Sequence, residues 1–185
     1  EKTVENPPKP GVHSLSNSFI HAMPAYLEQM NAIGIKWVSG YPTNREKNLP
    51  SIIGLKIINS PETGVPLAIM NATWTTNVRT AAVSAVTAKY CARKDSEVVG
   101  IIGAGVQGRI NILALKKTLP QLKKCKVYDI YPTASESFKE EISKQLDIEI
   151  EIVSSAEDAA RDSDIVITAT QKLPEPIVKF EWLKD

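Results

Sequence analysis

Three glycines in the middle of the chain have the spacing of a phosphate-binding turn. Residues 97–109 read E-V-V-G-I-I-G-A-G-V-Q-G-R, so Gly103, Gly105 and Gly108 follow a short apolar run. In a G-x-G-x-x-G turn the first glycine permits the tight strand-to-helix turn, and the second lets the backbone approach a pyrophosphate. The third lets the helix, whose N-terminus faces the phosphates, pack closely on its strand. The apolar run before the turn and the helical pattern after it favour dinucleotide binding over a turn without a ligand.

A carboxylate follows this turn at the distance expected for a ribose contact. Asp129 lies about 21 residues beyond Gly108, at the C-terminal end of a strand predicted over residues 124–130. There it could accept hydrogen bonds from the adenosine ribose, although a surface carboxylate at a strand end is the alternative interpretation. Residues 130–133 (I-Y-P-T) offer no cation for a 2′-phosphate. The sequence therefore predicts NAD rather than NADP.

An arginine stands where a helix disfavours a cation. Apolar residues recur at helical spacing over residues 75–92, which predicts a helix with Arg79 in its first turns. The positive end of the helix dipole repels a cation there. Either Arg79 is solvated, or it and the helix N-terminus together bind an anion; the residue pattern leaves both readings open.

Composition excludes several classes of partner. The 185 residues have a formal net charge of +1 and no Lys/Arg run, which indicates neither nucleic acid nor a membrane surface as a partner. Cys91 and Cys125 lack metal-ligand spacing, so we expect two buried apolar residues and no metal site. No signal peptide or transmembrane run is visible, which predicts a cytoplasmic protein. The chain begins at Glu1 and ends just after an apolar segment, so we expect a fragment of something longer.

The predicted elements must position these residues. Extended residues 1–12 precede hairpin-forming strands, with a polar loop at residues 41–50. These strands are predicted at 18–27, 32–39, 51–59 and 65–71. Beyond the helix at 75–92, strands and helices alternate, which predicts a parallel, doubly wound sheet. The strands are predicted at 98–102, 124–130, 148–153 and 164–170, and the helices at 106–118, 134–145 and 155–161.

Four segments together resemble a known family. They are G-I-K-W-V at 34–38, T-G-V-P-L-A-I-M at 63–70, N-V-R-T-A-A-V-S-A-V at 77–86 and V-G-I-I-G-A-G-V-Q-G at 99–108. From about residue 18 onward the chain is similar to the ornithine cyclodeaminase/μ-crystallin family. This resemblance implies an α/β fold in which an antiparallel α+β substrate-binding and dimerisation domain, residues 1–94, precedes an incomplete Rossmann-type NAD-binding domain, residues 95–185. About four strands of the Rossmann-type sheet would be present.

The resemblance also implies roles for single residues. Lys36 would be catalytic, reaching the substrate carboxylate and the reacting carbon, and Arg79 would contact both the carboxylate and the cofactor. The implied cofactor-binding residues are Ser51, Arg79, Thr80, Gly103, Gly105, Val106, Gln107, Gly108, Asp129, Thr168 and Thr170.

Two features depart from the family pattern. The family often has an arginine upstream of Met23-Pro24, but no arginine precedes Arg45 here, so Lys9 or His13 could take its place. A lysine cannot supply the planar bidentate grip of an arginine. The family's catalytic aspartate and the nicotinamide-side strands are expected outside this sequence.

The implied activity is NAD-dependent hydride transfer at the α-carbon of an L-amino acid or its cyclic imine. Ornithine cyclodeaminase is the first specific hypothesis. An alanine-type amino-acid dehydrogenase and a ketimine or pyrroline-2-carboxylate reductase are the alternatives. A μ-crystallin-like, nucleotide-dependent ligand-binding protein belongs to a different functional class. The resemblance further predicts a homodimer formed through residues 15–75.

Overall fold

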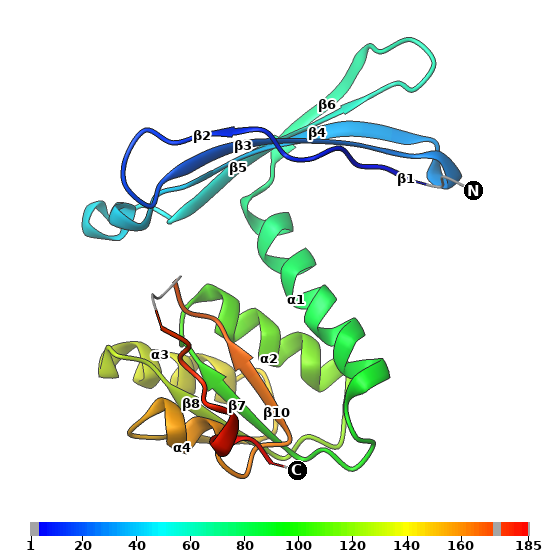
Figure 1. Cartoon of the computed structure of the whole chain (residues 1–185). Helices are drawn as coiled ribbons and strands as arrows, with labels where there is room; N and C mark the ends of the chain where they lie inside the picture. The colour runs from blue at the N-terminus through cyan, green and yellow to red at the C-terminus, as the bar shows by residue number, and fades with distance from the viewer. Residues whose placement is uncertain (1–3, 172–174, 185) are drawn as a thin grey trace. The chain divides into compact units, whose positions relative to one another are not determined.

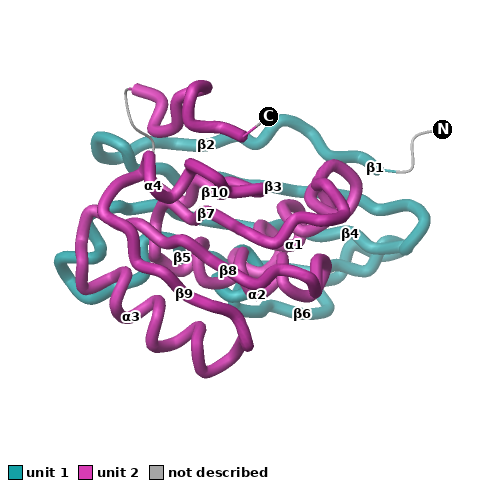
Figure 2. The backbone as a smooth tube through the Cα atoms, turned by 90° about the horizontal axis from the view of Figure 1, so that it is seen from below, with its two compact units in different colours: residues 1–76 teal, residues 77–185 magenta. Residues whose placement is uncertain are grey.

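The computed structural model describes residues 4–171 and 175–184, and the chain forms two compact units (Figures 1 and 2). Unit 1 comprises residues 1–76 and unit 2 residues 77–185. The division falls within helix α1 (Thr73–Cys91), whose first turn belongs to unit 1 and whose remainder belongs to unit 2. The sequence-based boundary at residue 94 lies after this helix.

Unit 1 is an antiparallel sheet. Its central strands lie in the order β3-β4-β5-β6, and the short strands β1 (Val4–Glu5) and β2 (Gly11–Val12) both pair with β3. The central strands are β3 (Phe19–Leu27), β4 (Ala32–Gly40), β5 (Ile52–Asn59) and β6 (Pro66–Asn71). All four match the predicted strands to within a residue or two. Short 3-10 helices η1 (Glu28–Met30) and η2 (Pro42–Lys47) connect them, so the predicted loop at 41–50 is partly helical.

Strand alternation gives this sheet two different faces. Ile33, Ile35 and Trp37 of β4 lie on one face, whereas Lys36 lies on the other, because successive side chains of a strand point to opposite faces. The hairpin between β5 and β6 closes through a turn at residues 60–64, where Gly64 has a φ of +74° that glycine adopts without strain. The apolar face and the lysine face are therefore set by the sequence pattern itself.

Unit 2 is a parallel α/β layer with the strand order β10-β7-β8-β9, and this confirms the predicted fold class (Figure 2). Its strands are β7 (Val98–Ile102), β8 (Lys124–Tyr128), β9 (Glu149–Ile152) and β10 (Ile165–Thr168). Its helices after α1 are α2 (Val106–Thr118), α3 (Pro132–Ser143) and α4 (Ala156–Ala160), and the 3-10 helix η3 (Phe180–Trp182) follows β10.

Two predicted strands are shorter than expected. β8 ends at Tyr128, so Asp129 follows the strand instead of forming part of it. β10 ends at Thr168, so the prediction of a strand through Thr170 is wrong. The last ladder hydrogen bond between β10 and β7 runs from the Ala169 N–H to the Ile102 carbonyl at 2.8 Å. Beyond it the chain leaves the sheet.

Helices cover both faces of the parallel sheet. Between β7 and the helices α2 and α3 lies a core of fully buried side chains, which includes Val99, Ile101, Ile112, Leu115, Phe138 and Ile142. On the opposite face α4 approaches so closely that a Cβ atom at Gly100 would collide with the Ala159 carbonyl. Ser155 caps α4, since its hydroxyl accepts the Asp158 N–H at 3.0 Å.

The two cysteines differ in their surroundings. Cys125 is fully buried in β8, and burial raises the pKa of its thiol to about 12, which makes it an unreactive core residue. Cys91, at the C-terminal end of α1, is exposed, so the prediction of burial holds for Cys125 alone.

Among the described helices, none has the length and apolar character needed to cross a membrane.

Candidate functional site

The glycine turn joins β7 to α2 in a conformation that requires glycine at two positions. Gly103 has a φ of +110°, and a Cβ atom there would come within 2.7 Å of the Ala169 carbonyl oxygen. A Cβ atom at Gly108 would collide with the Gly103 carbonyl oxygen, so α2 can pack against the turn only without a side chain at this position. The Gly103 N–H donates to the Tyr128 carbonyl at 2.8 Å, which fixes the turn to the end of β8.

The start of α2 has the features of an anion-binding helix terminus. Gly105 is the N-cap residue and offers no side chain to cap the helix, and the first turn carries no acidic residue. The first N–H groups of a helix have no partner within the helix and carry partial positive charge. A pyrophosphate placed at Gly105 and Val106 would satisfy both the N–H groups and the charge, so the residues present fit a dinucleotide.

Asp129 is held beside this turn by two backbone hydrogen bonds. Its Oδ2 accepts the Ala104 N–H at 2.8 Å, and its Oδ1 accepts the Tyr131 N–H at 3.0 Å. Each carboxylate oxygen can accept more than one hydrogen bond, so the fixed carboxylate retains capacity for ribose hydroxyls. Because Ala104 lies inside the glycine turn, the predicted phosphate and ribose contacts belong to one rigid local structure.

The cation nearest to this turn in the sequence binds side chains of helix α3. Arg109 follows Gly108, but its guanidinium contacts α3: Nε lies 3.1 Å from Glu141 Oε2, and Nη2 donates to Ser137 Oγ at 3.1 Å. It therefore ties α2 to α3 and does not supply the positive charge that a 2′-phosphate would need. This arrangement agrees with the preference for NAD over NADP.

Gln107 connects the glycine turn to helix α1. Its Nε2 donates to Asn77 Oδ1 at 3.1 Å, and its main-chain carbonyl accepts the Asn111 side-chain amide at 2.8 Å. Asn77 precedes Arg79 and Thr80 on α1; Arg79 is exposed and Thr80 is half-buried. Within unit 2, the turn and the second turn of α1 are thus held together.

The segment after β10 also reaches the turn. Thr168, the last residue of β10, pairs with Ile102 of β7, and Gly103 lies against the Ala169 carbonyl. Thr168 and Thr170 are both exposed. In an open parallel sheet, ligands bind at the carboxyl ends of the strands. The structure brings Thr168, Gly103 and Asp129 to this same edge of unit 2.

The predicted site residues of unit 1, Lys36 and Ser51, lie apart from each other. Lys36 is half-buried in the middle of β4, opposite Lys56 of β5. Ser51 precedes β5, five positions before Lys56 in the sequence, so it lies about 16 Å along the strand from the level of Lys36. Within unit 1 the structure therefore does not bring Ser51 and Lys36 together.

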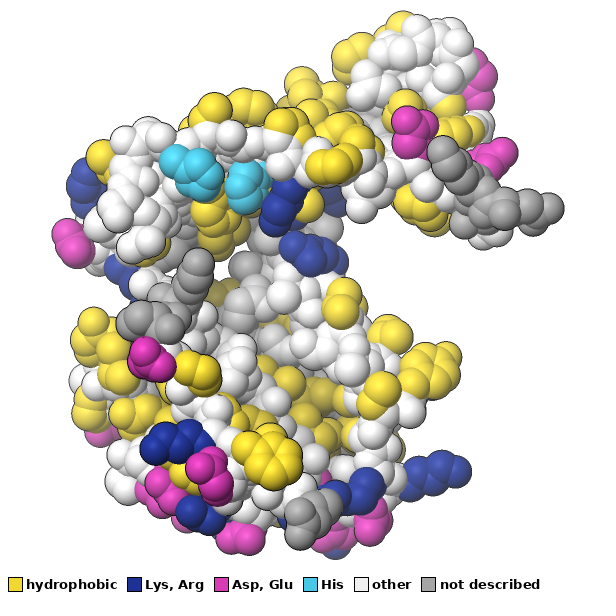
Figure 3. Space-filling model, viewed as in Figure 1, with side chains coloured by type: hydrophobic (Ala, Val, Ile, Leu, Met, Phe, Trp, Pro, Cys, Tyr) yellow, Lys and Arg dark blue, Asp and Glu magenta, His cyan; other side chains and the backbone are white. Residues whose placement is uncertain are grey.

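Basic side chains gather on the Lys36 face of this sheet. His21 stacks on Phe19, with ring centroids 4.3 Å apart, and the His13 ring stands edge-on to it at 6.3 Å (Figure 3). Partial burial and then the neighbouring charges of Lys9 and His13 lower the pKa of His21. The two groups suggested as substitutes for the family's upstream arginine, Lys9 and His13, thus both lie near His21.

The sequence interpretation missed Lys56 and Asn77. The signal for Lys56 was present, because β4 and β5 each carry one lysine in an otherwise uncharged strand, but the pairing of the two lysines depends on the register of the strands. Asn77 could not be found, because its partner Gln107 lies 30 residues away in the sequence.

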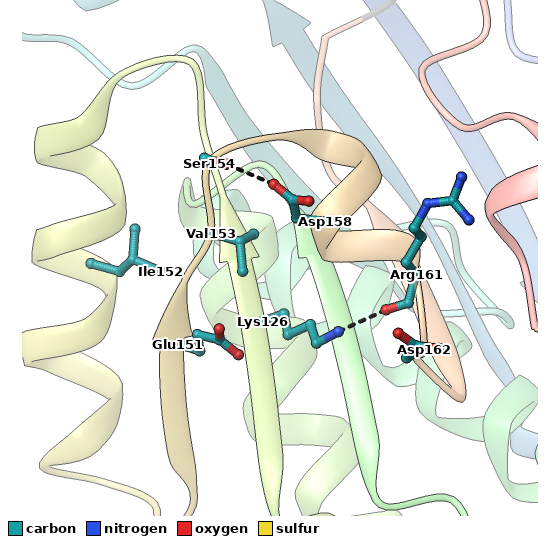
Figure 4. A pocket seen from close by; sticks show the side chains of 8 residues that line it. All are labelled: Lys126, Glu151, Ile152, Val153, Ser154, Asp158, Arg161 and Asp162. Atoms are coloured by element: carbon teal, nitrogen blue, oxygen red, sulfur yellow. Dashed lines mark hydrogen bonds between the residues drawn. The ribbon is translucent and has the colours of Figure 1, made fainter.

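A polar pocket on unit 2 lies apart from these residues. It measures about 500 Å³ and lies beside β9 and α4 (Figure 4). Lys126 Nζ donates to the Arg161 carbonyl at 2.7 Å, and Ser154 Oγ donates to Asp158 Oδ2 at 2.7 Å. Hydrogen bonds from Ser154 and Ser155 lower the pKa of Asp158. These contacts cap and fasten α4, and no predicted site residue lines this pocket.

Within residues 4–171 and 175–184, no cluster of three His, Cys, Asp or Glu residues could hold a metal ion.

Comparison with known proteins agrees with the sequence motifs and the geometry of the turn. The sequence model of the ornithine cyclodeaminase/mu-crystallin family matches residues 1–185. The chain belongs to this family. Its Arg79 and its glycine turn, from Gly103 to Gly108, stand in the segments on which the resemblance was based.

Solved members of the family share the fold. A Δ(1)-pyrroline-2-carboxylate reductase from Thermococcus litoralis, in complex with NADH and L-proline, is 45% identical with a TM-score of 0.93, covering 98% of this chain and 56% of that one. An archaeal alanine dehydrogenase dimer with bound NAD is 38% identical with a TM-score of 0.88, covering 98% of this chain and 54% of that one. Both cofactors agree with the NAD predicted from the sequence.

Ornithine cyclodeaminase is a more distant match within the family. The enzyme from Agrobacterium fabrum is 36% identical over 137 residues, which cover 74% of this chain and 38% of that protein. The chain spans about half the length of the curated relatives it matches.

Proposed function

We propose that the protein is an NAD-dependent oxidoreductase that acts at the α-carbon of an amino acid or a cyclic imino acid. The observation that carries this proposal is the clamped carboxylate of Asp129, whose Oδ2 accepts the N–H of Ala104 inside the glycine turn at 2.8 Å. Relatives that are 45% and 38% identical are a reductase and a dehydrogenase, which favours net hydride transfer over cyclodeamination.

The proposed cofactor site lies at the carboxyl edge of the sheet in unit 2. Residues 103–108 would hold the pyrophosphate against the N-terminus of α2, and Asp129 would accept hydrogen bonds from the ribose. Thr168 and Thr170 would line the adenosine side. Ser51, Thr80 and Arg79 are further cofactor contacts by family resemblance. The nicotinamide, when bound, would supply the hydride acceptor or donor.

Two basic residues would act on the substrate. Arg79 is exposed on α1, and its planar guanidinium could bind the carboxylate by two parallel hydrogen bonds, which would orient the α-carbon. Lys36 would contact the carboxylate and, near the reacting carbon, stabilise developing charge or transfer a proton at its Nζ. Both assignments follow from the family motifs G-I-K-W-V and N-V-R-T-A-A.

Two other functions compete with this one. Ornithine cyclodeaminase is the second candidate, supported by the 36% identity to that enzyme. A ligand-binding protein of the μ-crystallin type would keep the nucleotide site, but nucleotide binding alone does not need Lys36.

We also propose that unit 1 forms the interface of a homodimer. Apolar side chains on the face of the sheet opposite Lys36 are exposed, among them Ile33, Trp37, Ile53, Leu55 and Ile69. Figure 3 shows hydrophobic side chains along this sheet. An exposed apolar face of this kind is a common mark of an interaction site, and the archaeal alanine dehydrogenase relative is described as a dimer.

A cytoplasmic location stays a prediction.

A substrate panel on the intact protein tests the function. Alanine, ornithine, lysine and cyclic imino acids would be assayed with NAD or NADH for both ammonia and net change in NADH. We expect NADH formation together with ammonia, or NADH consumption with a cyclic imine. Ammonia without net NADH would identify a cyclodeaminase. NAD binding without turnover of any of these compounds would contradict the proposal and favour the ligand-binding function.

A further inference from the structure

A row of four side chains crosses the sheet of unit 1 at the level of Lys36. The strand register pairs Met23 with Lys36, Lys36 with Lys56, and Lys56 with Met70. Residues directly opposite each other on neighbouring strands share one face of a sheet. Lys36 and Lys56 therefore form a directly opposed pair of like charges on the face that carries the proposed catalytic lysine, with a methionine on either side.

The central strands carry no acidic residue. The four central strands read FIHAMPAYL, AIGIKWVSG, IIGLKIIN and PLAIMN and contain neither Asp nor Glu. Their three basic residues, His21, Lys36 and Lys56, all lie on the same face by register. The lysine face is therefore positively charged along these strands, whereas the opposite face is apolar.

Lys56 itself is half-buried. Within the part of the chain that the structure describes, its side chain has no ion pair or hydrogen bond. Like charges directly opposite each other destabilise a sheet, and the four central strands offer Lys56 no carboxylate to offset the charge of the lysine opposite it. A ligand with negative charge would offset the repulsion.

A second source of positive potential begins next to Lys56. The Ala72 N–H donates to the Gly54 carbonyl at 2.8 Å, and the Gly54 N–H donates to Thr73 Oγ1 at 3.3 Å. These bonds fix the start of α1 two residues along β5 from Lys56. The Thr73 N–H already donates to Asn71 Oδ1 at 2.8 Å, but the first turn of this 19-residue helix contains no acidic residue, so no carboxylate offsets its positive dipole end there.

We propose that Lys56 binds a second anionic group of the substrate, so that the preferred substrate is a dicarboxylic amino or imino acid. This inference rests on the proposed function, in which Lys36 contacts the α-carboxylate. The Cα atoms of opposed residues lie about 5 Å apart, so two lysine side chains can reach two carboxylates that are separated by two or three carbon atoms. Lys56 is then a specificity-determining residue.

Matched substrate pairs test this assignment in the intact protein. L-Aspartate is compared with L-2-aminobutyrate, and L-glutamate with L-norvaline, by NAD-linked kcat/KM; within each pair a carboxylate replaces a methyl group. We expect the wild-type protein to prefer the dicarboxylic member. Lys56→Met should lower kcat/KM for that member by about 10- to 100-fold, the effect of losing one charge-assisted hydrogen bond. The monocarboxylic member should change by less than about twofold, because it makes no such bond.

Two variants control for folding and for unspecific charge effects. Lys56→Arg should restore most of the preference. Lys47→Met, an exposed lysine of η2 outside the sheet, should leave both members of each pair unchanged. Thermal unfolding should show Lys56→Met to be at least as stable as the wild type, since the lysine repulsion is gone.

The outcomes separate this inference from the proposed function. Equal use of both members by the wild type, or an equal loss for both in Lys56→Met, would overturn the role of Lys56 while leaving an NAD-dependent enzyme. Inactivity toward these amino acids and toward the panel above would overturn the proposed function, and the role of Lys56 with it.

Discussion

Gln107 of the glycine turn donates a side-chain hydrogen bond to Asn77 of α1 at 3.1 Å. The residue proposed to bind the carboxylate, Arg79, stands two positions after Asn77. The loop proposed to hold the cofactor and the helix proposed to hold the substrate are thus fastened to each other inside unit 2. Such a link would position both ligands without touching the reacting atoms.

Asn77→Ala should loosen this link. It leaves the half-buried side-chain amide of Gln107 without its partner, which costs about 1 kcal/mol of stability. Gln107→Met should cost less, since it removes the donor together with Gln107 Oε1, a buried atom with no hydrogen bond among the described residues. Both variants should raise KM for the amino acid several-fold. Thermal unfolding and steady-state kinetics measure the two effects; an unchanged KM in both would show that the link is only structural.

Asp129→Asn should weaken NAD binding by about 10- to 100-fold, because hydrogen bonds to a charged acceptor contribute about 1.5–3 kcal/mol. The exposed Asp147→Asn serves as a control for the change in net charge. Fluorescence titration with NAD and NADP measures the affinities. The wild type should prefer NAD, and equal affinity for both cofactors would contradict the role of Asp129.

Asp164 should make the stability of unit 2 depend on pH. Burial alone would raise the pKa of Asp164, but hydrogen bonds from Lys184, from the Val98 and Glu97 N–H groups and from Arg93 outweigh it and hold the pKa well below its usual range. Because the pKa of Asp164 is lower in the folded than in the unfolded protein, its ionised carboxylate stabilises the fold at pH values above the unfolded-state pKa of about 3.9. This stabilisation is lost as the pH falls toward the folded-state pKa and the carboxylate becomes protonated.

Asp164→Asn should therefore destabilise the protein by about 2–4 kcal/mol at pH 7. This difference should shrink steadily as the pH falls below about 4. Urea unfolding of both proteins between neutral and acid pH gives the comparison. A difference that stays constant over this range would mean that shape, and not charge, accounts for the role of Asp164.

Much of the fold could be predicted, because its signals are local. Strand alternation around Lys36, the helical period of α1 and the glycine turn each follow from a few neighbouring residues. Predictions failed where the end of an element depends on a distant partner. β10 ends at Thr168 because Ala169 makes the last ladder bond to Ile102, on a strand more than 60 positions earlier. The Lys36–Lys56 pair was missed for a similar reason, since register is a property of two strands.

Leu55→Lys should dissociate the proposed homodimer. Leu55 is 51% exposed and lies opposite Trp37, which is 50% exposed, on the apolar face of unit 1. A lysine at the centre of an apolar interface would leave a buried, unpaired charge. Light scattering at micromolar concentration should show a dimer for the wild type and a monomer for Leu55→Lys. Tyr90→Lys, at an exposed position on α1 in unit 2, should remain dimeric. A monomeric wild type would refute the interface.

Lys36→Met should abolish most turnover while leaving the cofactor site intact. Lys36 on β4 is not among the proposed cofactor contacts, so NAD affinity should change little. Methionine keeps the apolar stem of lysine between Met23 and Lys56, so the sheet should stay folded.

Removing a group that stabilises charge or transfers a proton at the reacting carbon typically lowers kcat by about 100- to 10,000-fold. NAD titration, thermal unfolding and kcat on the preferred substrate, each measured beside Lys47→Met, separate catalysis from binding and folding. If Lys36→Met kept wild-type turnover, Lys36 would not be catalytic. A ligand-binding role would gain support only if the wild type also turned over none of the panel.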